Sequence, residues 1–223
     1  MRCCIFGAGD YDGRGVGGMS LHSIVENSLV IAADAGYEHV VRYAVRADIL
    51  LGDFDSLGDG AISGKNIRVI RHPVEKDDTD TALAAEEGIR AGCDEFFIFG
   101  GTGGNRPDHT VANIQVLVSL AERGAAAYLI GNTGIFTVIK DSRLVFDPAC
   151  SGGISVFSLS PRSEHTVVKG LYYSADDVTL TNDRALGVSN RFISASADIS
   201  VGSGTLLVFW SNTVNPLPLR IAP

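Results

Sequence analysis

The hydrophobic pattern of the chain changes near Gly131, and this change limits the folds that the sequence can adopt. Before that point, short apolar runs alternate with segments whose apolar residues recur at helical spacing. After it, short β-rich runs follow one another between Gly, Ser, Asn and Asp, without a convincing helical pattern. Alternation of strands and helices predicts a mainly parallel sheet, and consecutive strands predict an antiparallel sandwich. We therefore expect an α/β, Rossmann-like domain over 1–135 and a β-sandwich domain over 136–223.

The expected elements follow from these periods. In the first part, strands are predicted at 3–6, 29–33, 49–51, 67–70, 96–99 and 126–130. Helices are predicted at 20–26, 37–45, from Asp78 or Thr79 to 91, and at 110–123. In the second part, strands are predicted at 136–139, 154–159, 166–168, 178–180, 199–201 and 206–210.

Charge and composition argue against several classes of protein. A net charge of -8 argues against nucleic-acid binding, because phosphate backbones are held by basic surfaces. No apolar run approaches the length of a membrane span, and the N-terminal segment reaches Gly7 too early for a signal peptide. The four cysteines show no metal-binding or C-x-x-C spacing, so we expect reduced core thiols. We expect a cytoplasmic protein that binds neither nucleic acid nor membrane.

Aspartates follow the predicted parallel strands, at the edge where α/β sheets bind ligands. They are Asp34, Asp53, Asp55, Asp77, Asp78, Asp80 and Asp108. Each one alone could cap a helix or solvate a turn. Crowded together, carboxylates repel one another, and a Mg²⁺ ion with oxygen ligands would relieve that repulsion. Asp53 and Asp55 are two residues apart in an extended segment, so both side chains can face one ion.

A glycine-rich stretch from Gly100 to His109 combines four glycines with Arg106 and an Asp-His pair at a predicted helix start. Glycines allow close backbone approach, arginine can bind phosphate with two hydrogen bonds, and a helix N-terminus favours anions. The stretch predicts phosphate binding, and the alternative is an ordinary surface loop. The segment Gly13 to Gly18 also fits G-x-G-x-x-G, but it lies several residues beyond its strand, which argues against NAD binding.

At these residues the sequence resembles the thiamine pyrophosphokinases. Five segments carry the resemblance, in the order and spacing of the family's motifs: Ala33-Asp34-Ala35-Gly36, Gly52-Asp53-Phe54-Asp55-Ser56, Asp77-Asp78-Thr79-Asp80, Gly103 to Asn113, and Gly187-Val188-Ser189-Asn190. Two differences stand out. Ala35 replaces a glycine, and Asn105 is inserted before Arg106.

The resemblance implies a homodimeric enzyme that transfers the pyrophosphoryl group of ATP to the hydroxyl of thiamine, giving thiamine diphosphate and AMP. It implies a catalytic group of Asp53, Asp55, Asp77, Asp80 and Asp108. Asp53, Asp55 and Asp77 would hold Mg²⁺, and Asp80 would be a further ligand or support them. Asp108 would orient the hydroxyl or accept its proton. ATP and phosphate binding is expected from Asp34, Gly103, Gly104, Arg106, His109 and Asn113. Thiamine binding is expected from Tyr173, Ser189 and Asn190, near the dimer interface.

The residues themselves also favour a homodimer. The β-rich part is short for an independent core, and the run 206–210 is apolar throughout, unlike a strand with one solvated face. A second copy of the chain would cover that second face, and a two-fold dimer is the commonest arrangement.

Two other functions compete with pyrophosphoryl transfer. Asp53-x-Asp55 after an apolar strand resembles a haloacid-dehalogenase-type phosphohydrolase, with Asp53 as nucleophile. Leu57 stands where that class has Thr or Val, and no later lysine motif follows. A non-catalytic thiamine or nucleotide sensor is the second alternative, but it would not need so many metal-type carboxylates.

Overall fold

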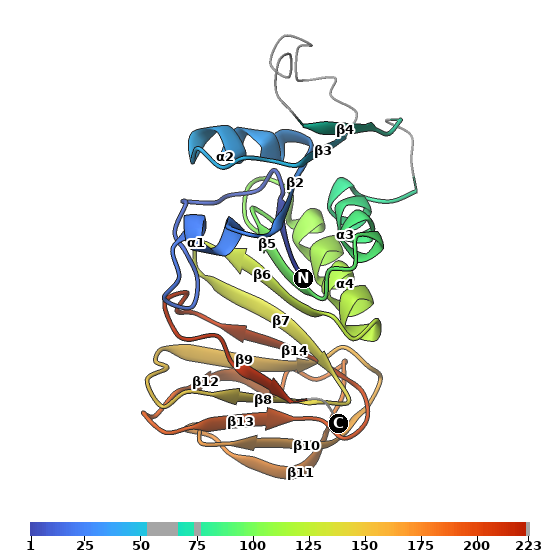
Figure 1. Cartoon of the computed structure of the whole chain (residues 1–223). Coiled ribbons are helices and arrows are strands. Elements are labelled where there is room, and N and C mark those ends of the chain that lie inside the picture. The colour runs from blue at the N-terminus through green and yellow to red at the C-terminus, as the bar shows by residue number, and fades with distance from the viewer. Residues whose placement is uncertain (53–66, 74–76, 222–223) are drawn as a thin grey trace.

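The computed structural model describes residues 1–52, 67–73 and 77–221. Figure 1 shows an α/β part that continues into a stack of two sheets. The α/β strands are β1 (Arg2–Phe6), β2 (Leu29–Ala33), β3 (Ile49–Gly52), β4 (Arg68–Arg71), β5 (Glu95–Phe99) and β6 (Ala126–Gly131). All pairs in the order β6-β5-β1-β2-β3-β4 are parallel, as predicted. Their carboxyl ends therefore lie along one edge of the sheet.

Short polar signals decide where the helices begin. The helical elements are α1 (Leu21–Val25), the 3₁₀ helix η1 (Asp34–Gly36), α2 (Tyr37–Arg42), α3 (Asp80–Arg90) and α4 (Pro107–Glu122). Thr79, rather than Asp78, caps α3, because its hydroxyl accepts a hydrogen bond from the backbone of Ala82. Helix α4 begins at Pro107, earlier than predicted, because proline suits a first turn whose N–H groups need no helical partner. None of the helices in the described ranges combines the length and apolar character needed to cross a bilayer.

The C-terminal strands form two antiparallel groups. The strands β7 (Gly134–Lys140), β14 (Thr205–Trp210), β9 (Gly153–Ser158) and β12 (Gly187–Arg191) extend the first sheet to ten strands. A second sheet has the order β11 (Ala175–Leu180), β10 (Ser163–Lys169), β13 (Ala197–Ser200), β8 (Arg143–Phe146) and β15 (Leu219–Ile221). Residues 151–210 are all described and contain no helix. The predicted fold class, an α/β part followed by an antiparallel β-sandwich, is confirmed.

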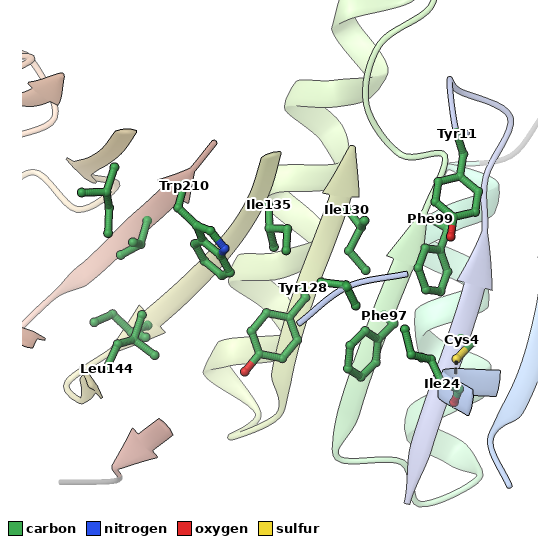
Figure 2. Packing of buried hydrophobic residues seen from close by; sticks show 14 of the residues in the cluster. Cys4, Tyr11, Ile24, Phe97, Phe99, Tyr128, Ile130, Ile135, Leu144 and Trp210 are labelled. Carbon is green, nitrogen blue, oxygen red and sulfur yellow. Dashed lines mark hydrogen bonds between the residues drawn. The ribbon is translucent and has the colours of Figure 1, made fainter. Parts of the chain in front are cut away.

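The two parts share one sheet and one hydrophobic core. Strands β6 and β7 are joined by a tight turn and pair antiparallel in the same sheet. The predicted boundary at 135/136 falls inside β7. Figure 2 shows buried side chains running from Cys4 in β1 through Tyr128 to Trp210 in β14. The Trp210 ring meets Tyr128 and Phe146 edge to face, at 6.5 and 5.4 Å between centroids. The ten-stranded sheet contains strands from both parts, so it crosses the predicted boundary. The division into two domains remains a prediction.

The apolar strand β14 is covered within a single chain. Leu206, Val208 and Trp210 are fully buried on the side of the second sheet, and Leu207 is buried on the opposite face. Phe209 packs against Phe136 with 4.6 Å between ring centroids. A strand in the middle of a sandwich is apolar throughout because both faces are packed. The run 206–210 therefore gives no support for a second copy, and our argument from it was wrong.

Gly36 allows η1 to pack across the end of β1. A Cβ atom at this position would lie 1.9 Å from the carbonyl oxygen of Phe6 and 2.5 Å from its carbonyl carbon, and both are backbone atoms. We expect Gly36→Ala to lower the free energy of unfolding by about 1–3 kcal/mol, because the two segments would have to separate. Urea unfolding measures this change, with Gly153→Ala as the control, since its nearest neighbour would be 3.5 Å away. Equal stability of the two variants would contradict the close packing.

Candidate active site

A cavity of about 230 Å³ opens at the carboxyl edge of the parallel strands, beyond the ends of β1, β2 and β5. All of the residues predicted to bind ATP or phosphate line it: Asp34, Gly103, Gly104, Arg106, His109 and Asn113. They come from η1, from the loop after β5 and from α4. The structure thus brings this set together, and its binding role stays a prediction.

The loops after β1 and β5 are joined along the floor of this cavity. The backbone N–H groups of Gly7 and Gly9 donate to the carbonyls of Phe99 and Gly100, at 2.8 and 2.6 Å. A Cβ atom on Gly9 would lie 2.7 Å from the Gly100 oxygen, so the two loops can approach only with glycine there. Sequence reasoning missed the segment 7–9. Its signal was a pair of glycines directly after the first strand.

Two buried side chains donate hydrogen bonds to backbone carbonyl groups of these loops. The Asn113 side-chain amide is buried and donates to the Gly101 carbonyl at 2.8 Å. His39, also buried, donates from Nε2 to the Gly9 carbonyl at 2.8 Å, because a carbonyl can only accept. Asn113 therefore shapes the cavity through the backbone, a way of acting that its residue type alone did not indicate.

Arg106 and Asp108 form an ion pair at the mouth of the cavity. Arg106 Nε lies 3.0 Å from Asp108 Oδ1, and Arg106 Nη2 lies 2.7 Å from Oδ2. Both side chains are well exposed, at 65% and 62%. The hydrogen bonds from Arg106 lower the pKa of the Asp108 carboxyl to about 2. Asp108 is therefore ionised at neutral pH and is a weak base there.

The predicted metal ligands are only partly visible. Asp53 and Asp55 lie outside the described residues. Gly52, which ends β3, packs against Asp34, since a Cβ on Gly52 would be 3.1 Å from the Asp34 Cα. Asp80 lies in the first turn of α3. Exposed Asp77 lines a different hollow, a groove of about 460 Å³ between α3 and α4, and not the glycine-lined cavity.

Carboxylate oxygens are suitable donors for a hard cation, so the residue types fit Mg²⁺. Among the residues that the structure describes, no cluster of three or more metal-binding side chains is found. The metal site therefore stays a prediction that depends on the segment after Gly52.

Two of the three predicted thiamine residues line a second cavity, of about 400 Å³, in the sandwich. Its walls are mainly apolar and include Tyr173 and Asn190. The Asn190 side chain accepts from the Tyr173 N–H at 2.9 Å and donates to the Tyr173 carbonyl at 2.7 Å. Ser189 is exposed beside this cavity with a positive φ of 64°. The structure brings Tyr173 and Asn190 together, and Asn190 acts on the Tyr173 backbone.

Comparison with known proteins agrees with this architecture. Residues 21–129 match the family model described as "Thiamin pyrophosphokinase, catalytic domain". The thiamine pyrophosphokinase of Bacillus subtilis is 26% identical over 197 residues, which cover 83% of this chain and 88% of the relative. A crystal structure of thiamine pyrophosphokinase from Bacillus subtilis superposes with a TM-score of 0.82 at 23% identity, covering 95% of this chain and 99% of that one. Thiamin pyrophosphokinase from Candida albicans gives a TM-score of 0.74 at 14% identity, with 95% and 89% covered.

The structural matches define the class, a parallel α/β sheet that continues into an antiparallel sandwich. Within that class, the catalytic-domain match over residues 21–129 and the curated relative are both thiamine pyrophosphokinases. The chain is therefore similar to the thiamine pyrophosphokinases in sequence as well as in fold.

Proposed function

We propose that this chain transfers the pyrophosphoryl group of ATP to the hydroxyl of thiamine, giving thiamine diphosphate and AMP. The observation that carries this proposal is the glycine-lined cavity, which gathers residues from three separate elements that sequence reasoning had assigned to phosphate binding. The similarity to thiamine pyrophosphokinases supports the same reaction.

The phosphate groups of ATP would lie in the glycine-lined cavity. The sixteen-residue helix α4 begins at its mouth, so the positive end of the helix and nearby backbone N–H groups favour an anion. Arg106 adds a positive charge close to the same helix end. Phosphoryl transfer depends mostly on positioning and charge neutralisation, and these groups supply both.

Asp53, Asp55 and Asp77 would hold Mg²⁺, with Asp80 in support. The ion would supply positive charge to the phosphates and align them for attack. Asp108 would hold Arg106 in place and orient the hydroxyl rather than accept its proton. Its pKa of about 2 leaves it a weak base at neutral pH, which favours the orienting role.

Thiamine would occupy the sandwich cavity, with its rings against the apolar walls and Tyr173 at the entrance. Exposed apolar side chains line this cavity or pack against its lining: Tyr172, Tyr173, Leu186 and Val188. A second copy of the chain would cover this surface, so we propose a homodimer in which one copy's sandwich faces the other copy's phosphate cavity. Light scattering measures the molar mass of the chain in solution. A monomer at a concentration where the chain is active would contradict this arrangement.

The state of the cysteines supports a proposal for the cellular compartment of the protein. Cys3, Cys4, Cys93 and Cys150 are all buried free thiols. Reduced thiols are typical of a reducing compartment, which supports a cytoplasmic location.

Product analysis tests the proposed reaction. The chain is incubated with ATP, Mg²⁺ and thiamine, and the products are separated by chromatography. Equal amounts of AMP and thiamine diphosphate are expected. Inorganic phosphate without thiamine diphosphate would indicate the phosphohydrolase instead, and ligand binding without any product would indicate the sensor.

Removing the aromatic ring at the cavity entrance tests the thiamine site. We expect Tyr173→Ala to raise the KM for thiamine by about threefold to tenfold, as the loss of one aromatic contact predicts, and to leave the KM for ATP nearly unchanged. Tyr173→Phe keeps the ring and should behave like the unmodified protein. Steady-state kinetics measure both constants, and an equal rise in both for Tyr173→Ala would remove Tyr173 from the thiamine site.

A further inference from the structure

Asp10, in the loop between β1 and α1, contacts the glycine loop after β5 at two points. Its backbone N–H donates to the Thr102 carbonyl at 3.1 Å. Its side-chain Oδ2 accepts a hydrogen bond from the Gly104 N–H at 2.9 Å. One residue therefore binds the glycine loop on both sides of Gly103.

The fit between this carboxylate and the loop depends on glycine. Gly103 and Gly104 both have positive φ, at 76° and 70°. A Cβ atom on Gly103 would lie 2.9 Å from Asp10 Oδ2 and 3.2 Å from the Asp10 Cβ. The loop therefore turns directly over the Asp10 side chain, at a distance and with a backbone conformation that glycine allows without strain.

The carboxylate of Asp10 is exposed and does not line the cavity. Gly103 and Gly104, which it contacts, do line it. The bonds from Gly7 and Gly9 to the strand end and loop after β5 fix the backbone leading to Asp10. The side chain is thus held against the loop without lining the cavity.

We propose that Asp10 is a positioning residue, whose carboxylate holds residues 102–104 in the shape that receives the phosphates of ATP. The proposal rests on the proposed function, since it assigns phosphate binding to this cavity. Asp10 acts as a hydrogen-bond acceptor for the loop and does not touch the substrate. A neutral acceptor of the same shape should therefore replace it.

Three variants separate this role from others. Asp10→Ala removes the acceptor, and Asp10→Asn keeps an oxygen that can accept from Gly104. Asp12→Ala is the matched control in the same loop, because Asp12 pairs with Arg14 and does not line the cavity. Calorimetry measures the Kd of the magnesium–ATP complex, steady-state kinetics measure both KM values, and thermal unfolding checks the fold. Amide hydrogen exchange reports the protection of the Gly104 N–H.

We expect Asp10→Ala to raise the Kd and KM for ATP by about tenfold, as loss of a charge-assisted hydrogen bond predicts, with the thiamine KM within about twofold. Gly104 exchange should become faster in that variant only. Asp10→Asn and Asp12→Ala should resemble the unmodified chain. A merely structural role would not produce this split between ATP and thiamine, or its rescue by asparagine.

Two results would overturn the proposal. One is an unchanged or lower Kd for ATP in Asp10→Ala. The other is equal impairment of Asp10→Asn, which would indicate that the charge matters rather than the acceptor. Failure of the unmodified chain to bind ATP would overturn the proposed function and this proposal together. Normal ATP binding that does not respond to Asp10→Ala would overturn only the role of Asp10.

Discussion

Replacing Asp55 by asparagine is expected to reduce turnover by roughly a thousandfold or more while leaving the fold intact. Asp55 follows β3, in a segment outside the described residues, and is proposed to bind Mg²⁺ against the phosphates. A neutral amide is a poorer magnesium ligand than a carboxylate, and the ion supplies charge that the transition state needs. Formation of AMP measures the loss, and circular dichroism checks the fold.

A surface aspartate provides the control for this experiment. Asp176 lies on β11, is well exposed and pairs with Lys169 at 3.0 Å. Asp176→Asn should leave turnover unchanged. Near-normal activity of Asp55→Asn at ordinary magnesium concentrations would exclude Asp55 from the metal ligands.

Replacing Arg106 by glutamine is expected to lower kcat/KM for ATP by about a hundredfold, because the phosphates lose a fixed positive charge. Thermal stability should hardly change, since the ion pair with Asp108 is exposed and such pairs contribute little to stability. If Asp108 acts through Arg106, then Asp108→Asn should lower kcat/KM for ATP by a smaller factor. The double variant should then have the same kcat/KM as Arg106→Gln alone. Multiplied losses would mean that the two residues act independently.

The pH dependence gives a second check on Asp108. The hydrogen bonds from Arg106 lower its folded-state pKa to about 2, so the interaction is fully present above the ordinary carboxyl pKa and is lost as pH falls towards 2. Titration of Asp108 therefore cannot produce a loss of activity between pH 5 and 8. An acid limb in that range that Asp108→Asn abolishes would restore Asp108 as the general base.

The parallel strands could be predicted because burial on both faces leaves continuous apolar runs, as in β1 and β5. Strands β8, β12 and β15 were missed. β12 is a partly exposed edge strand that contains Ser189 and Asn190, and its polar residues read as a loop. The pattern change near Gly131 was assigned to a domain boundary, although the chain reverses there within the same sheet.

The candidate site was predictable where residue type alone carries the chemistry. The glycines and Arg106 of the loop after β5 line the expected cavity. Asn113 and Asn190 were assigned as ligand contacts, but in the structure their amides bind backbone groups. Asp10 could not be found from sequence, because its partner Gly104 lies far along the chain and meets it only after β1 and β5 have paired.

Transfer of the β- and γ-phosphates as one group is the central claim, and the fate of labelled phosphorus tests it most directly. ATP carrying radioactive phosphorus at the β-position is mixed with the chain, Mg²⁺ and thiamine, and the products are separated. We predict that the label is found in thiamine diphosphate and that AMP is unlabelled. Label in ADP, with thiamine monophosphate as the other product, would contradict pyrophosphoryl transfer.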